Sequence, residues 1–347
     1  MSIFWLIAFT MTADAAAEPL EGDFAAYRKQ HSLTCVGPFD GIIQTSEVQL
    51  AGKPYRLSGS KLTITPSAKD ADDEVRFGVL GSVKDFLPET KRNLDRLFDW
   101  FNQEKVEWVV LNGDIGGEEE EFEELVEYLA GFKKPLLVSI GNYESRGTYF
   151  RVISAAAEKY PWIIDQNLVR VIEADDVVLI SMPGYYDRRF LHTGSGCLYK
   201  SEDIDATLDA VEKTPGPRLL ISHGPPRGVG SRSIDVVADG RVNVGDPELT
   251  RLIREGAIEF GIFGHILESG GRAVGGDLTT PVAVETWSPK LYVNVGTANG
   301  LPWGLNDGTT VTGMGAVFTV KGNKAKTKFK IYRDAGAAPS IAASKVD

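Results

Sequence analysis

Residues 106–114 read VEWVVLNGD, and residues 135–142 read PLLVSIGN. Both stretches are short apolar runs that end at a glycine and a polar residue, which is typical of a buried strand followed by a sharp turn. The residues between them, GEEEEFEELVEYLAGF at 117–132, are typical of a helix. This order of strand, helix and strand predicts a βαβ unit and therefore an α/β fold.

The same alternation continues on both sides of this unit. Upstream, residues 74–81 (EVRFGVLG) predict a buried strand, and residues 88–103 predict a helix that begins at a proline. Further apolar strands are predicted downstream at residues 177–184, 217–224 and 258–265. The last strands follow one another without helices, at residues 291–296, 315–322 and 325–332. This pattern predicts a mixed sheet, or two stacked sheets, flanked by helices.

The two ends of the chain differ in composition from this main domain, which we place at residues 73–334. Residues 21–72 are rich in turns and short β-like runs, and they predict a small β extension that packs onto the main domain. Residues 335–347 predict a disordered tail.

The first residues resemble a secretory signal peptide. Residues 3–11 (IFWLIAFTM) form an apolar run, and small residues suited to a cleavage site follow it up to residue 17. The run is too short to span a bilayer, so no transmembrane span is expected. The segment departs from the signal-peptide pattern in that no basic residue precedes Arg28. The alternatives to a signal peptide are a frayed apolar N-terminus or a misassigned start codon. We expect export to the periplasm or the outside of the cell.

The bulk composition is that of a globular protein and limits the classes of partner. Of the 347 residues, 43% are hydrophobic, so folding needs neither a disulfide nor a structural metal. The formal net charge of −11 argues against nucleic acid or anionic lipid, because both require a basic surface. An acidic protein can still bind phosphate where a metal ion supplies local positive charge.

The chain has two cysteines, Cys35 and Cys197. In an exported protein they would form one disulfide, and the alternative is two buried, unlinked thiols. The sequence favours neither. The two residues do not form a C-x-x-C pair, so thiol-redox chemistry is not expected.

Polar side chains end four of the predicted strands, each beside a glycine. They are Asp114, Asn142, His223 and His265. Open α/β sheets bind ligands at the carboxyl ends of their strands, so we expect these four side chains to converge. A carboxylate, an amide oxygen and two imidazoles suit Zn, Mn or Fe, which accept mixed nitrogen and oxygen ligands. The sequence therefore predicts a site for one divalent metal ion.

The order of these residues resembles the motifs of the calcineurin-like metallophosphoesterases. The family pattern runs D-x-H, G-D, G-N-H-D/E, H and G-H-x-H. It is matched in order at residues 81–84 (GSVK), 113–114 (GD), 141–144 (GNYE), 223 (H) and 264–267 (GHIL). The resemblance covers about residues 74–333 and implies an α/β/β/α sandwich of two mixed sheets flanked by helices. It also implies hydrolysis of phosphate esters by a metal-activated water.

Departures from the family pattern fall on one of its two metal sites. The family ligands of the first ion are replaced here by Ser82, Lys84 and Leu267. The ligands of the second ion are all retained, as Asp114, Asn142, His223 and His265. The resemblance therefore implies one retained ion, with activity that is reduced or altered.

Three residues are candidates for catalytic roles beside that ion. Tyr143 stands where the family has a histidine that protonates the leaving group, and a phenol is less well matched to neutral pH. Lys84 would neutralise Asp114 in place of the missing ion, the alternative being a lysine that extends into solvent. Arg227 would bind a phosphate oxygen, the alternative being a surface role. Replacement metal ligands are also considered at Asp85, Glu144 and Glu268.

Two functions are consistent with this sequence. The first is a metal-dependent phosphoesterase-like hydrolase that acts on a small-molecule phosphate monoester or diester. The alternative is a catalytically inactive exported protein that uses the same fold as a scaffold to bind a protein partner. The lost first site favours the alternative, and the intact second site favours the hydrolase.

Overall fold

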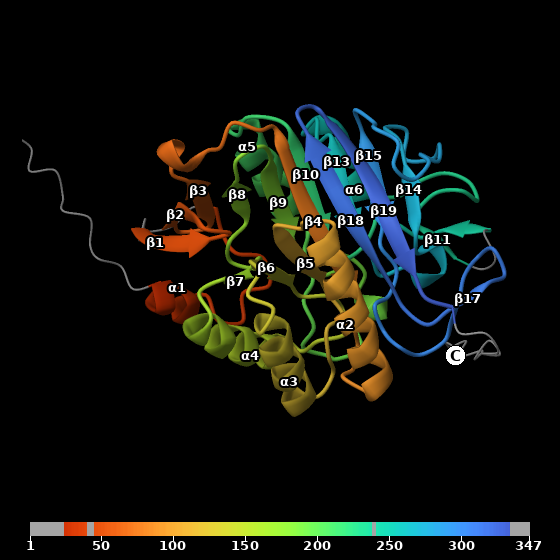
Figure 1. Ribbon diagram of the computed structural model, residues 1–347, viewed down its shortest axis with the longest axis horizontal. Coiled ribbons are helices and arrows are strands. Elements are labelled where there is room, and N and C mark those ends of the chain that lie inside the picture. The colour runs from red at the N-terminus through yellow and green to blue at the C-terminus, as the bar shows by residue number, and fades with distance from the viewer. Residues whose placement is uncertain (1–23, 40–44, 238–240, 334–347) are drawn as a thin grey trace, which may run out of the picture.

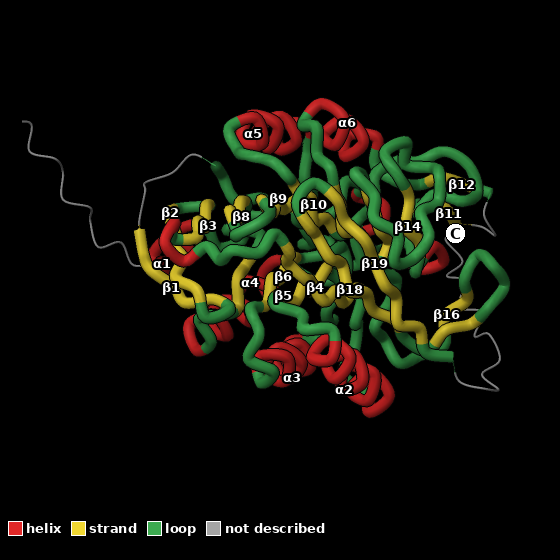
Figure 2. Tube along the Cα trace, turned by 45° about the horizontal axis from the view of Figure 1, so that its top comes forward, coloured by secondary structure: helices red, strands yellow, loops and turns green. Residues whose placement is uncertain are grey.

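The computed structural model describes residues 24–39, 45–237 and 241–333, which form four layers (Figures 1 and 2). Two β-sheets pack against each other, and helices cover their outer faces. One sheet is covered by α2 (Pro88–Gln103), α3 (Glu119–Ala130) and α4 (Arg146–Lys159), the other by α5 (Ser201–Glu212) and α6 (Pro247–Glu255). The predicted α/β/β/α sandwich is confirmed. The predicted signal peptide and disordered tail lie outside the described residues.

The six-stranded sheet contains the βαβ unit that the sequence predicts. Its order is β19 (Lys324–Ile331), β18 (Met314–Lys321), β4 (Glu74–Gly81), β5 (Trp108–Asn112), β6 (Leu136–Ser139) and β7 (Ile163–Asp165). Strands β4 to β7 are parallel, whereas β18 is antiparallel to both β4 and β19. The carboxyl ends of β4, β5 and β6 therefore lie at one edge of the sheet.

The nine-stranded sheet is built around four parallel strands. Its order is β1 (Thr45–Leu50), β2 (Lys53–Ser58), β3 (Lys61–Ile64), β8 (Val171–Glu173), β9 (Val178–Met182), β10 (Arg218–Ser222), β13 (Phe260–Phe263), β15 (Leu291–Asn294) and β14 (Arg272–Val274). Strands β9, β10, β13 and β15 are parallel, so their carboxyl ends share one edge. Two short hairpins complete the described strands: β11 (Val236–Val237) with β12 (Val242–Asn243), and β16 (Trp303–Gly304) with β17 (Thr310–Val311).

The core has three parts, one between each pair of layers. Apolar side chains from both sheets fill the space between them, among them Phe77, Trp108, Phe260 and Phe318. Because strands such as β5 are buried on both faces, they are apolar throughout rather than alternating. This packing fixes the two strand edges relative to each other, and the polar strand ends meet there.

Strands β1, β2 and β3 of the N-terminal region extend the larger sheet. This region begins with α1 (Phe24–Gln30), a helix that the sequence analysis does not predict, and ends with the 3-10 turn η1 (Pro66–Ala68). Strands β1, β2 and β3 form an antiparallel meander, and β3 pairs in parallel with β8 of the main domain. Backbone hydrogen bonds therefore make the predicted extension continuous with the nine-stranded sheet.

Cys35 and Cys197 form a disulfide, with Cα atoms 5.1 Å apart. This decides between the two alternatives left open by the sequence. The bond joins the N-terminal segment to the loop before α5 and closes a sequence separation of 162 residues. The Cys35 carbonyl also accepts a hydrogen bond from Asn167 Nδ2 at 3.1 Å, so the junction is both covalent and hydrogen-bonded.

Removing this disulfide should lower thermal stability. For the double variant Cys35→Ala/Cys197→Ala we expect a loss of about 2–5 kcal/mol, because the unfolded chain regains the freedom of a long loop. Scanning calorimetry should then show Tm reduced by roughly 5–15 °C. Dithiothreitol should lower the Tm of the parent chain toward that of the variant and leave the variant unchanged. An unaltered Tm in the variant would contradict a stabilising role.

None of the helices among the described residues combines the length and apolar character that a membrane crossing requires.

Candidate metal centre

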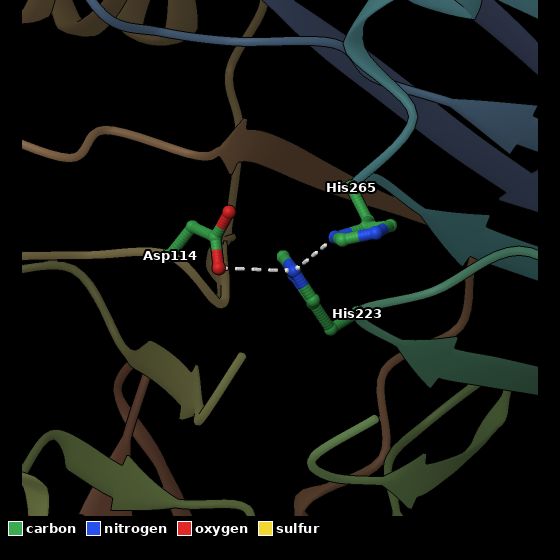
Figure 3. Close-up of side chains that lie close together, drawn as sticks. All are labelled: Asp114, His223 and His265. Atoms are coloured by element: carbon green, nitrogen blue, oxygen red, sulfur yellow. Dashed lines mark hydrogen bonds and ion pairs between the residues drawn. The ribbon is translucent and has the colours of Figure 1, made fainter. Parts of the chain in front are cut away.

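The four predicted metal ligands come together where the strand ends of the two sheets meet. Asp114 follows β5, Asn142 follows β6, His223 follows β10 and His265 follows β13. His223 Nε2 lies at the centre, 3.1 Å from Asp114 Oδ1 and 3.2 Å from His265 Nδ1 (Figure 3). It also lies 2.9 Å from Asn142 Oδ1. The atoms that Asp114, His223 and His265 offer to a metal all lie within 4.8 Å of one another.

Hydrogen bonds outside the cluster orient two of these ligands. His223 Nδ1 lies 2.9 Å from the Asn112 carbonyl, to which it donates, so Nε2 faces the cluster. Asn142 Nδ2 donates to the Phe190 carbonyl at 2.6 Å, which turns Oδ1 toward His223. The atoms aimed at the centre are therefore a bare imidazole nitrogen and an amide oxygen, as a metal ion requires.

The backbone around the cluster adopts conformations that non-glycine residues rarely occupy. Asp114 has φ 52° and His265 has φ 62°, both in the left-handed region. At Gly141 a side chain would collide with the Asp114 backbone nitrogen and with Asp114 Oδ1. Strained positions of this kind persist where the surrounding structure enforces them, and they gather at functional sites. The turn at Gly141 thus leaves room for the carboxylate.

Charge in this buried cluster is concentrated on Asp114. Burial alone would raise the pKa of Asp114, but His223, Lys84 and His265 together lower it well below its usual range. Burial opposes a charge on His223, yet the Asp114 carboxylate outweighs it and raises the pKa of His223. Burial and the neighbouring His223 lower the pKa of His265 to about 3, so that imidazole is neutral at pH 7.

The residues present fit a divalent cation. Asp114 Oδ1 is buried beside His223 Nε2 at 3.1 Å, and a neutral His223 whose Nδ1 donates to Asn112 offers that oxygen no proton. A cation coordinated at this atom would balance the ionised carboxylate. The donor set of one carboxylate, one amide oxygen and two imidazoles matches Zn, Mn or Fe.

The positions of the family's other ion are occupied by side chains that do not coordinate metals in this way. Leu267 is buried in the 3-10 turn η3 (Leu267–Ser269), and Ser82 is buried before the Lys84 turn. Lys84 has φ 66° and places its Nζ 3.7 Å from Asp114 Oδ2. Of the two orientations considered for Lys84, the structure has the inward one, with its ammonium beside the carboxylate.

Glu144 is a buried support for the ligand turns. Its carboxylate accepts hydrogen bonds from the backbone N–H groups of Gly141, at 2.9 Å, and Ile115. These two residues are the chain neighbours of Asn142 and Asp114, so one side chain ties both turns together. Burial and the Asp114 charge raise the pKa of Glu144 to about 7.

The other two carboxylates considered as replacement ligands differ in their surroundings. Asp85 accepts hydrogen bonds from Thr90 Oγ1 and Asn299 Nδ2, both at 2.5 Å, so it is directed toward the start of α2. Glu268 is half-buried, and burial raises its pKa against the opposing effect of the Lys84 charge. The Lys84 charge therefore acts on both Asp114 and Glu268.

The remaining catalytic candidates, Tyr143 and Arg227, lie in different places. Tyr143 is half-buried, and its ring centroid is 5.9 Å from Lys84 Nζ. Burial and the Asp114 charge raise the pKa of Tyr143, so its phenol holds its proton more firmly than usual. Arg227 is exposed near the start of α6, and its Nε donates to the Gly245 carbonyl at 2.8 Å. No contact joins Arg227 to the four ligands within the described part of the chain.

Residues 183–187 (PGYYD), between β9 and α5, suit either pocket lining or simple packing, and sequence reasoning missed Phe190 and His192 as neighbours of the site. Here Tyr185 packs on His265 with ring centroids 4.2 Å apart, and Phe190 lies 6.3 Å from the same ring. The His192 backbone N–H donates to the Asn142 carbonyl at 3.1 Å. The only available signal was the run of aromatic residues at 185–190, which equally suits ordinary packing.

The fold and this cluster define an α/β/β/α protein with a candidate metal site at the strand ends. The family model described as calcineurin-like phosphoesterase matches residues 87–269. The chain belongs to this family. The matched segment contains all four candidate ligands. No curated protein sequence matches the chain.

Solved structures share the fold at low sequence identity. One crystal structure superposes with a TM-score of 0.55 and 14% identity, covering 75% of this chain and all of that chain (100%). The protein TT1561 of Thermus thermophilus gives a TM-score of 0.47 at 10% identity, over 73% of this chain and 98% of that chain. A dimetal phosphatase from Danio rerio gives 0.44 at 11% identity, over 76% of this chain and 100% of that chain. At these identities the likeness concerns the fold alone.

Proposed function

We propose that this protein hydrolyses small phosphate esters with one divalent metal ion held by Asp114, Asn142, His223 and His265. The observation that carries the proposal is the convergence of these four side chains around the buried carboxylate of Asp114. A cation held there supplies Lewis-acid activation of a water molecule and of a phosphoryl oxygen. Family membership supports this class of reaction.

Lys84 takes the electrostatic role of the family's other ion. Its ammonium, 3.7 Å from Asp114 Oδ2, balances the carboxylate on the side that faces away from His223. The side chain is 28% exposed, so the ammonium remains accessible to a phosphate oxygen. A single positive charge stabilises a phosphoryl group less than a divalent ion does. We therefore expect slower hydrolysis than a two-ion site would give.

Tyr143 is the candidate donor to the ester oxygen. Because its pKa is raised, the phenol is protonated at neutral pH and can donate a hydrogen bond. The same raised pKa makes complete transfer of its proton to the leaving group unfavourable. Esters with good leaving groups should therefore be hydrolysed best. Arg227 Nε donates to the Gly245 carbonyl, and phosphate binding by Arg227 stays a prediction.

We also propose that the protein is exported. The Cys35–Cys197 disulfide supports this, because disulfides persist in oxidising compartments and are rare in the cytosol. The alternative function, an inactive scaffold for a protein partner, has no specific observation in its favour among the described residues. An intact set of four ligands is not needed by a scaffold.

Metal content and hydrolysis test the proposal directly. Elemental analysis of protein purified without chelators or a histidine tag should give about one Zn, Mn or Fe per chain. Dialysis against a chelator should abolish hydrolysis of an aryl phosphate, and adding back the ion should restore it. A chain that carries no ion, or whose activity survives chelation, would contradict the proposal.

A further inference from the structure

Aromatic rings lie beside the two partly exposed members of the polar centre, Lys84 and His265. Lys84 Nζ lies 5.7 Å from the centroid of Trp303 and 5.9 Å from that of Tyr143. His265 is flanked by the rings of Tyr185 and Phe190. These rings come from three segments that are far apart in the sequence. The two groups placed to hold a phosphate oxygen, Lys84 and the metal cluster, are thus bordered by flat apolar surfaces.

Exposure separates the rings that pack from those that are free to contact a ligand. Tyr185 is only 1% exposed, so it supports His265 from within the fold. Phe190 is 42% exposed, and Trp303 is partly exposed. The indole nitrogen of Trp303 is buried without a hydrogen-bond partner among the described residues. Accessible aromatic surface beside a buried charged cluster is typical of ligand sites.

Both accessible rings are held in place by the backbone. The Phe190 carbonyl accepts the Asn142 Nδ2 hydrogen bond at 2.6 Å, and Asp187 caps the 3-10 turn η2 (Arg188–Phe190). Trp303 lies on the β16–β17 hairpin, where it pairs with Val311. Because the backbone that bears each ring is already ordered, less freedom is lost when a ligand stacks on it.

Resting on the proposed function, we infer that the substrate carries a flat aromatic group next to its phosphate, and that Phe190 and Trp303 determine this specificity. The phosphoryl group would lie between Lys84 and the metal ligands. The rest of the molecule must then leave the centre past the bordering rings. A planar group can lie against these faces, whereas an aliphatic group of similar size cannot stack on them.

Non-hydrolysable phosphonates test this inference without interference from leaving-group reactivity. Phenylphosphonate and cyclohexylphosphonate have the same charged group and similar bulk, and they differ in planarity. Titration calorimetry on the metal-loaded protein should show the phenyl compound binding about five- to tenfold more tightly, the range expected for aromatic contacts. The variants Phe190→Leu and Trp303→Leu should each reduce this preference severalfold.

Trp287→Leu is the matched control. Trp287 is also partly exposed and also lies near a lysine, 4.7 Å from Lys326 Nζ, but it lies against β19 rather than at the metal centre. This variant should keep the full preference. Equal binding of the two phosphonates, or a preference that survives in both Phe190→Leu and Trp303→Leu, would overturn this inference and leave the proposed function standing. Failure of both phosphonates to bind would instead contradict the proposed function on which the inference rests.

Discussion

His223→Ala should lose its metal ion and its hydrolytic activity together. His223 Nε2 is within 3.2 Å of an atom from each of the other three ligands, so its removal opens the centre of the cluster. Mutation of a residue that hydrogen-bonds to a metal ligand lowers metal affinity by about 10- to 100-fold, and loss of a direct ligand should lower it further. We expect hydrolysis to fall at least about a thousandfold, which corresponds to roughly 4 kcal/mol.

The comparison requires a histidine variant away from the cluster. His31→Ala serves as this control, because His31 contacts Tyr27 near α1, with ring centroids 4.5 Å apart. It should retain the ion and full activity. Circular dichroism and Tm should be recorded for both variants, since His223 is fully buried and its loss also breaks the bond to Asn112. If His223→Ala folds unstably, Asp114→Asn provides the same test with less change in shape. A folded His223→Ala protein that keeps one ion and normal activity would contradict the site.

Lys84→Met should lower activity while tightening metal binding. The ammonium lies near both Asp114 and the cation site, so removing it takes away a charge that stabilises phosphate and a charge that repels the ion. At this distance and in a partly exposed position we expect an effect of about 1–3 kcal/mol on the transition state, after allowance for screening by solvent. Activity should therefore fall about ten- to hundredfold. A metal titration should show affinity raised severalfold.

The opposite signs of these two effects distinguish an electrostatic role from a structural one. A lysine that merely supported the fold would lower both quantities when removed. Lys84→Arg should retain part of the activity because it keeps the charge. Lys91→Met is the control, since Lys91 also lies near aromatic rings, 5.2 Å from Tyr128, but on α2. Unchanged hydrolysis in Lys84→Met would show that the ammonium has no part in the reaction.

The fold and the four metal ligands could be predicted from the sequence because both depend on local pattern. Apolar runs such as residues 106–114 are long enough to identify buried strands, and glycine marks the turns that follow. Once the strands are parallel, their carboxyl ends must share an edge. A polar residue at each end, such as Asp114 or His223, is then brought to the site by the sheet itself.

The orientation of Lys84 and the pairing of Cys35 with Cys197 could not be settled in this way. The sequence does not show whether the Lys84 side chain points toward Asp114 or into solvent. In the folded chain, the left-handed backbone at Lys84 accompanies a side chain whose ammonium lies beside Asp114. Two cysteines separated by 162 residues form a bond only if the fold brings their Cα atoms to about 5.1 Å. Both outcomes depend on distances that the local pattern does not contain.

The sequence by itself thus predicted the central βαβ unit, the four candidate ligand positions and the replacement of the other site's ligands, but it did not predict α1. Only the tertiary structure decided which side chains border the candidate metal centre. Phe190 and Trp303 belong to irregular segments whose pattern carries no periodic signal, and they reach the metal centre through contacts with His265 and Lys84. Periodicity encodes which face of an element is buried, whereas the neighbours of a loop residue follow from how the two sheets and their connections pack.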